Sequence, residues 1–147
     1  MDQIPNPEPT AVFVYGTLKQ GHVRSGRWPR PPQSIAVATI RAQLFDLGPY
    51  PGILPGDDLV AGEMWCFPPD AMRETLAVLD AVEGFGQGGR DLYLRRVVEA
   101  VDEQGVGRAA YAYFFARPDK MQSAIRLAPG PDGRCRWPAH HAGSDSA

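Results

Sequence analysis

The sequence predicts an α+β fold in which a small sheet, curled into a barrel, packs against one helix. Five apolar runs of strand length are rich in β-branched and aromatic residues. One further segment, between the third and fourth of these runs, has the apolar spacing of an amphipathic helix. Strands on both sides of a single helix in this order favour the α+β class.

The first strand is expected at residues 11–15, an apolar run between a proline and a glycine, which is typical of a strand buried on both faces. Residues 21–33 contain three prolines and are expected to form a loop. A second strand follows at 35–47, and the sequence Gly-Pro-Tyr-Pro-Gly at 48–52 favours a rigid turn. The other strands are expected at 59–67, 92–101 and 108–116.

The helix is expected over residues 70–82. Its apolar side chains recur at spacings of four, three and three residues, which places them on one face. They are Met72, Leu76, Leu79 and Val82. Asp70 lies where the first helical turn favours an anion, and Gly84 lies where helices commonly end.

The chain is expected to form one domain. Its 147 residues are 44% hydrophobic and 22% charged, which is the composition of a globular domain that needs no disulfide or metal to build a core. We expect the domain at residues 11–128, after a flexible N-terminal segment at 1–10. Residues 129–147 are rich in Pro, Gly, Ser and Ala, and we expect them to form a mobile tail.

Charge and hydropathy argue against two classes of partner. A net charge of -2 gives no basic footprint for nucleic acid. No apolar run approaches the roughly 18 residues of a membrane span. The first ten residues lack the positive start and apolar run of an export signal, so a cytoplasmic protein is expected.

A structural disulfide between Cys66 and Cys135 is not expected in a reducing compartment. Cys66 is interpreted as a buried, inert thiol; the alternative, a nucleophile paired with a histidine, has no support from the spacing. No Cys or His pair has the spacing of metal ligands except the adjacent His140 and His141, so no metal site is expected.

The loop that follows the first strand is a candidate binding element. Tyr15-Gly16-Thr17-Leu18 comes directly after a buried strand, and Gly16 allows a sharp turn that exposes consecutive N–H groups. Such a nest binds an anion or a carbonyl oxygen, although the local pattern also fits a plain turn. The loop lacks the features of a phosphate-binding P-loop.

Five acidic residues are candidates for a general base: Asp46, Glu63, Glu74, Asp80 and Glu83. Glu74 and Asp80 fall outside the apolar stripe of the helix and are assigned to the solvated surface. Glu63 either points outward or is a buried acid. Glu83 ends the helix, where the dipole and partial burial both disfavour its carboxylate and are expected to raise its pKa toward the range of a general base.

Six segments together resemble the gamma-glutamylcyclotransferase-like family, which includes gamma-glutamylamine cyclotransferases and the plant avirulence-induced proteins. They are VFVYGTLKQG at 12–21, LFDLGPYPGI at 44–53, GEMW at 62–65, LDAVEGF at 79–85, LYLRRVV at 92–98 and AYAYFF at 110–115. A lone YGTL is a weak signal, but the ordered set is specific and covers most of the chain. The resemblance implies a small barrel of mixed strands with flanking helices.

The resemblance also implies roles for individual residues. The YGTL-type loop lines the substrate pocket in such proteins, which assigns substrate binding to Tyr15, Gly16, Thr17 and Leu18. The Glu of the helix-ending motif is the family's general base and corresponds to Glu83. The Tyr of the next motif corresponds to Tyr93, as a possible pocket residue. Departures at residues 22–25 and 86–89 leave the substrate open.

The implied reaction is an intramolecular cyclisation of a small-molecule γ-glutamyl substrate, which releases 5-oxoproline and a free amine. No metal or cofactor is implied, because ring closure already holds the reacting groups together. Two alternatives stay open: the same fold acting on another γ-glutamyl conjugate, and a small-molecule-binding module without catalysis.

Overall fold

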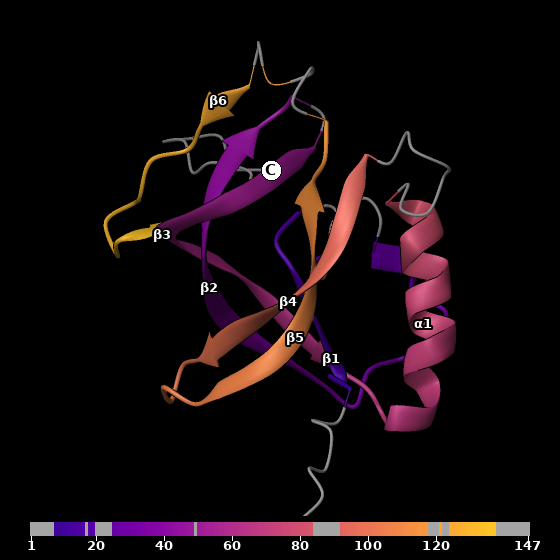
Figure 1. Cartoon of the computed structure of the whole chain (residues 1–147). Helices are drawn as coiled ribbons and strands as arrows, with labels where there is room; N and C mark the ends of the chain where they lie inside the picture. Colours follow the sequence, from indigo (N-terminus) through magenta and orange to yellow (C-terminus); the bar gives the residue numbers. More distant parts are fainter. Residues whose placement is uncertain are drawn as a thin grey trace, which may run out of the picture.

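The structure is a computed structural model and describes residues 8–16, 18–19, 25–48, 50–83, 92–117, 121 and 124–137. The described strands include five that close into a barrel, and the helix α1 (Pro69–Val82) lies along the side of this barrel (Figure 1). The barrel strands are β1 (Ala11–Val14), β2 (Ser34–Asp46), β3 (Pro51–Cys66), β4 (Tyr93–Asp102) and β5 (Gly107–Phe115). A short 3-10 turn, η1 (Ser25–Arg27), precedes β2.

The strands neighbour one another in the order β2-β4-β5-β1-β3, and the pairing of β3 with β2 closes the barrel. β1 runs parallel to β5, whereas the other pairs within the barrel are antiparallel. The α+β class, with a small barrel of mixed strands and a flanking helix, is confirmed.

Two hydrophobic cores explain why β1 is apolar at every position. Ala11 and Phe13 pack inside the barrel, whereas Val12 and Val14 pack in the layer between the barrel and α1. Side chains alternate between the two faces of a strand, so a strand with a core on each side needs a continuous apolar run. This strand therefore holds the residue that follows it, Tyr15, in a fixed place.

The helix α1 packs through the apolar stripe that the spacing predicts. Ala71, Met72, Thr75 and Leu79 are its buried residues, and Leu76 and Val82 pack at the edge of the same cluster. Pro69 begins the helix, where a missing N–H costs no helical hydrogen bond. These contacts hold α1 against the barrel as far as its last turn. Glu83 is the residue that follows this turn.

β3 begins at Pro51 rather than at residue 59, so part of the expected turn at 48–52 belongs to a strand. The pairing with β2 shifts register between Ala42 and Gln43, because residues 55–57 bulge out of the ladder. Gly56 lies in this bulge, and a β-carbon there would come within 2.4 Å of Gln43 Cγ. The strand thus begins eight residues earlier than expected and continues through the Pro55-Gly56 pair.

The packed part of the chain extends beyond residue 128, the expected end of the domain. Two short strands follow: β6 (Ile125–Arg126) pairs with β2, and β7 (Arg134–Cys135) pairs with β3. Cys135 is fully buried in the barrel core, and Trp137 packs against it. Residues 129–137 therefore differ from the mobile tail expected there; residues 138–147 lie outside the described part.

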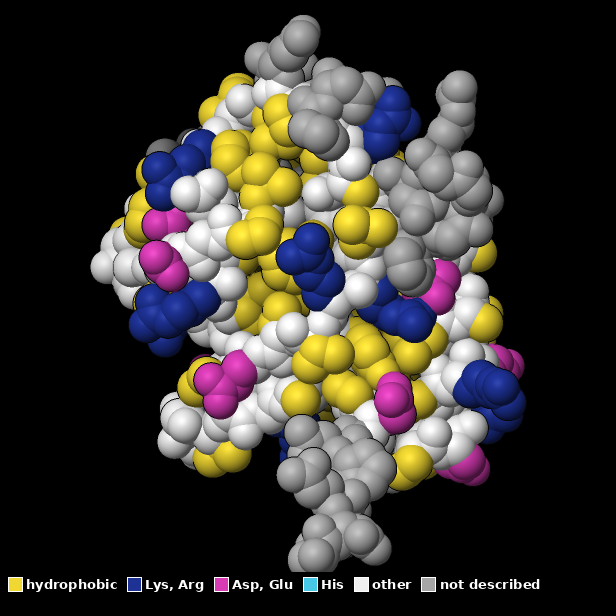
Figure 2. Space-filling view, in the orientation of Figure 1, with side chains coloured by type: hydrophobic (Ala, Val, Ile, Leu, Met, Phe, Trp, Pro, Cys, Tyr) yellow, Lys and Arg dark blue, Asp and Glu magenta, His cyan; other side chains and the backbone are white. Residues whose placement is uncertain are grey.

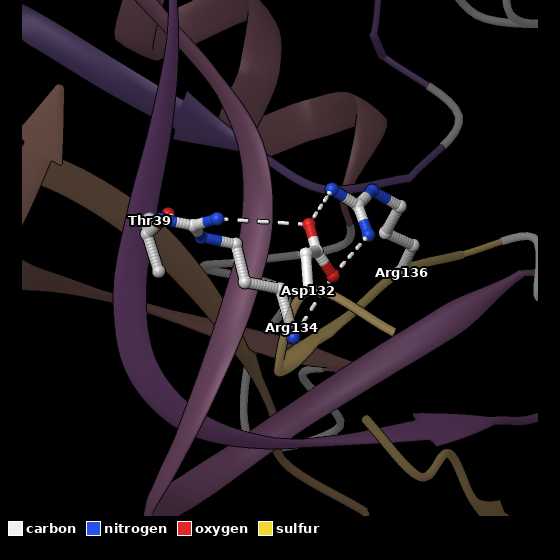
Figure 3. Close-up of polar contacts among 4 residues, drawn as sticks. All are labelled: Thr39, Asp132, Arg134 and Arg136. Atoms are coloured by element: carbon white, nitrogen blue, oxygen red, sulfur yellow. Dashed lines mark hydrogen bonds and ion pairs between the residues drawn. The ribbon is translucent and has the colours of Figure 1, made fainter. Parts of the chain in front are cut away.

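Polar contacts also fix this C-terminal segment to the barrel. Arg134 Nε donates a hydrogen bond of 3.1 Å to Thr39 Oγ1 on β2 (Figure 3). Asp132 pairs with Arg134 and, four residues along, with Arg136. These exposed ion pairs contribute little each, whereas Cys135 and Trp137 bury apolar surface against the barrel core.

Both cysteines are buried free thiols. Among the described residues, no helix has the length and hydropathy needed to span a membrane. Lys and Arg side chains are interspersed with Asp and Glu on the face shown in Figure 2, so this face carries no large patch of one sign.

The N-terminal segment is tied to β5 where the structure describes it. The hydroxyl of Tyr111 donates a hydrogen bond to Glu8 Oε1. Burial, and then the hydrogen bond and charge of Glu8, raise the pKa of Tyr111 to about 12. Glu8 belongs to residues 1–10, which the sequence predicts to be flexible; residues 1–7 lie outside the described part.

The raised pKa of Tyr111 predicts a loss of stability at alkaline pH. An unfolded tyrosine titrates near pH ~10, whereas Tyr111 in the folded chain titrates at about 12. Its contribution is therefore complete below pH ~10 and is lost as the pH rises toward ~12. We expect the urea midpoint of Tyr111→Phe to fall less than that of the parent between about pH 8 and about pH 11. Parallel declines in the two proteins would contradict the prediction.

Candidate active site

A pocket opens where the end of β1, the start of β3 and the C-terminal end of α1 meet, and β4 and β5 complete its wall. It is lined by Phe13, Val14, Tyr15, Gly16, Leu18, Tyr50, Pro51, Glu83, Tyr93 and Tyr113. The space between the walls is about 360 Å³ with the open mouth included, so the pocket is small.

Five of the residues that the sequence singled out line this one pocket. They are Tyr15, Gly16, Leu18, Glu83 and Tyr93. Residues from two motifs that are far apart in the sequence, the loop after β1 and the end of α1, thus face a common space. Thr17 lies outside the described residues, so the expected nest of N–H groups stays a prediction.

Gly16 occupies a position where a side chain does not fit. The loop turns here, with the Lys19 N–H donating to the Gly16 carbonyl over 3.1 Å. A β-carbon at Gly16 would lie 2.6 Å from Cγ of Pro51, the first residue of β3. Because atoms cannot approach so closely, glycine allows the loop to lie directly against β3 and to form one wall of the pocket.

Glu83 also lines the pocket. It caps the C-terminus of α1, where its N–H donates to the Leu79 carbonyl over 2.8 Å. It is half-buried, and it is the one charged residue among the described residues that line the pocket. Burial, then Tyr93 and the charge of Glu83, raise the pKa of Tyr15 well above its ordinary value. The charge of Glu83 thus contributes to the electrostatic environment of the Tyr15 hydroxyl.

The hydroxyls of three lining tyrosines donate to protein acceptors. Tyr15 donates to the Tyr113 carbonyl over 2.6 Å, and Tyr93 donates to the Pro51 carbonyl. Tyr113 donates to Asp80 Oδ1 over 2.6 Å. With their protons engaged, these side chains form a fixed frame. Among the described lining residues, Glu83 is the side chain that carries a carboxylate.

The other acidic candidates, Asp46, Glu63, Glu74 and Asp80, are not among the lining residues. Glu63 Oε1 accepts a hydrogen bond of 3.0 Å from Trp65 Nε1. Glu74 is exposed, as the sequence suggested. Asp80 differs from that assignment, since its side chain is only 23% exposed and pairs with Arg95. No group of three or more His, Cys, Asp or Glu suited to a metal occurs among the described residues.

Sequence reasoning missed several residues of the pocket wall. The sequence pattern places Tyr50 and Pro51 in a turn and Tyr113 in a strand, whereas all three line the pocket. All three lie within the segments that carry the family resemblance, so the motifs held a signal for them. Their part in the pocket depends on how the strands close into a barrel, which local patterns do not specify.

Comparison with known proteins identifies the family. The family model described as "Gamma-glutamyl cyclotransferase, AIG2-like" matches residues 12–132. The chain belongs to this family. It is 32% identical over 114 residues to the gamma-L-glutamyl-butirosin B gamma-glutamyl cyclotransferase of Niallia circulans, which covers 76% of this chain and 70% of the relative. It is 34% identical over 110 residues to the family protein YtfP of Escherichia coli K12, covering 73% and 83% of the two chains.

Solved structures share the barrel. The solution structure of Escherichia coli YtfP matches with a TM-score of 0.56 and 30% identity, over 86% of this chain and 95% of that one. The crystal structure of an AIG2-like protein from Mus musculus matches with a TM-score of 0.57 and 20% identity, over 92% and 99%. The family assignment from the six sequence segments is confirmed, and so is the fold.

Proposed function

We propose that this AIG2-like family member is a gamma-glutamyl cyclotransferase that converts a γ-glutamyl amine or amide into 5-oxoproline and a free amine. The α-amine nitrogen of the γ-glutamyl group attacks its own γ-carbonyl carbon. The new C–N bond closes a five-membered ring, and the original amide C–N bond breaks. Atoms balance without water or any co-reactant.

Glu83 is the general base of this proposal. Its carboxylate takes a proton from the α-ammonium, which frees the amine to attack, and passes this proton to the leaving nitrogen. The ring nitrogen loses a second proton, which protonates the released amine, so the carboxylate ends the cycle as it began. The observation that carries the proposal is its position: among the described lining residues it is the charged one, and three of the four tyrosines beside it, at 15, 93 and 113, donate their hydroxyl protons to protein groups.

The loop at Gly16 is assigned to the oxygen atoms of the substrate. Its close contact with Pro51 fixes the backbone, and fixed N–H donors stabilise an oxyanion without reorganising during the reaction. The small volume of the pocket supports a role in holding the γ-glutamyl group. Ring closure supplies much of the rate, because the nucleophile and the carbonyl belong to one molecule.

A panel of γ-glutamyl compounds tests this proposal. It contains a γ-glutamyl alkylamine, a γ-glutamyl dipeptide and γ-L-glutamyl-butirosin B. We expect 5-oxoproline and the free amine to appear in equal amounts from at least one of them, measured by mass spectrometry. If no compound is turned over, the proposal fails. If one binds without turnover in calorimetry, a binding module without catalysis replaces it.

A second candidate is the same reaction on a larger, tailored conjugate. The relative in Niallia circulans, whose name specifies such a γ-glutamyl conjugate, favours it. Selective turnover of γ-L-glutamyl-butirosin B over the two smaller compounds would support this candidate.

A further inference from the structure

The last turn of α1 is tied to the barrel by a polar cluster that does not itself line the pocket. The carboxylate of Asp80 accepts a hydrogen bond of 2.6 Å from the Tyr113 hydroxyl through Oδ1. Arg95 Nη1 donates a hydrogen bond of 2.5 Å to the other oxygen, Oδ2, and the two side chains form an ion pair. These two partners lie on neighbouring strands, Arg95 on β4 and Tyr113 on β5, where the two residues face each other in register. One carboxylate therefore joins α1 to two strands.

The placement of Asp80 is unfavourable for the helix alone. A carboxylate in the last turn lies at the negative end of the helix dipole. Its side chain and that of Arg95 are only 23% and 25% exposed, so both charges also lose part of their hydration. The contacts with Arg95 and Tyr113 offset these costs only in one arrangement of helix and strands. The cluster thus favours a specific position of the helix end.

The same cluster connects directly to the pocket. Tyr113 lines the pocket, and its backbone carbonyl accepts the hydrogen bond from Tyr15. Burial, and then the hydrogen bond and charge of Asp80, raise the pKa of Tyr113 well above its ordinary value, so the hydroxyl stays a proton donor to Asp80. Glu83 follows Asp80 by three residues, and residues three apart lie on neighbouring parts of a helix surface.

We propose that Asp80 is a positioning residue: by joining the last turn of α1 to Tyr113 and Arg95, it sets where the Glu83 carboxylate stands in the pocket. The inference rests on the proposed function in that Glu83 is the base to be positioned. Asp80 acts through Tyr113 and the helix, and it does not itself line the pocket. A small displacement of a general base lowers the rate while leaving contacts that hold the substrate largely in place.

The test is Asp80→Asn, with Glu74→Gln as its matched control. Both substitutions replace a carboxylate on α1 by its amide, and both remove an ion pair with an arginine. The pair of Glu74 with Arg30 is exposed, 50% and 55%, and lies away from the lining residues. We expect Asp80→Asn to lower kcat by about 10- to 100-fold with KM changed much less, while Glu74→Gln keeps parental values.

A double-mutant cycle with Tyr113→Phe checks that Asp80 acts through this contact. If the two residues work as one unit, the double variant loses little more kcat than the worse single variant. Additive losses would overturn the proposed route through Tyr113. Parental kcat in a folded Asp80→Asn protein would overturn the proposal itself. If Asp80→Asn fails to fold, Tyr113→Phe alone replaces it, with a parental kcat again overturning the proposal.

A second readout separates this proposal from the proposed function. Amide hydrogen exchange of residues 80–83 reports the fixation of the helix end without any substrate. Faster exchange there in Asp80→Asn, but not in Glu74→Gln, supports positioning even if the parent turns over no compound of the panel. Unchanged exchange at 80–83 in that case overturns it.

Discussion

Glu83→Gln is expected to lower turnover of the best γ-glutamyl compound by about 10²- to 10⁴-fold, the usual contribution of general-base catalysis. The amide keeps the size and much of the hydrogen-bonding shape of the side chain, but it removes the oxygen that accepts the proton. The substrate should still bind, because the loop at Gly16 and the tyrosine frame of the pocket are untouched. The loss is therefore expected in kcat.

The same substitution is expected to leave stability unchanged or slightly higher. Glu83 places a negative charge at the C-terminus of α1, which costs about 0.3–1 kcal/mol at an exposed helix end. Removing the charge relieves that cost. Glu83 would then be a residue that activity requires and that lowers stability, which is common at functional sites.

The measurement is 5-oxoproline release beside thermal melts of the parent and the variant. Glu74→Gln serves as the control, because it makes the same chemical change on an exposed part of the same helix. Near-parental turnover in a folded Glu83→Gln protein would show that Glu83 is not the base. A large drop in melting temperature would instead indicate that Glu83 has a structural role.

Local sequence patterns predicted those parts of the fold whose signals are local. The stripe of Met72, Leu79 and their neighbours predicted α1, because a helix exposes its periodicity within a few turns. The unbroken apolar run at 11–15 predicted a strand between two cores, which is where β1 lies. The position of Glu83 at the helix end followed from the same stripe.

Features that depend on distant partners were not visible in local patterns. The local pattern places the third strand at 59–67, but β2 supplies a partner on both sides of the bulge at 55–57, so the strand begins at Pro51. Asp80 falls outside the apolar stripe and was assigned to the surface. Its burial depends on Arg95 and Tyr113, which β4 and β5 bring to it from later in the chain. Composition likewise could not show that a Pro- and Gly-rich segment at 129–137 packs against the barrel.

That C-terminal segment leads to the second large effect. Deleting residues 130–147 is expected to destabilise the protein by at least about 2 kcal/mol, the low end for loss of a large buried side chain. The deletion removes Cys135 from the barrel core and Trp137 from its edge, and it exposes the part of β3 that pairs with β7. It should also disturb the pocket, because the Trp137 carbonyl accepts a hydrogen bond of 2.7 Å from Lys19 Nζ, next to the loop of Gly16.

The matched control is a chain that ends after Trp137, which keeps every described contact of the segment. We expect this chain to have the same melting temperature as the full-length protein. The chain that ends at Pro129 should melt about 4–8 °C lower, since about 1 kcal/mol corresponds to about 2–4 °C for a domain of this size. It should also release 5-oxoproline more slowly at temperatures where it is still folded. Equal melting temperatures for the two truncated chains would show that residues 130–137 add nothing to the core. In that case the domain would end near residue 128, as the composition alone suggests.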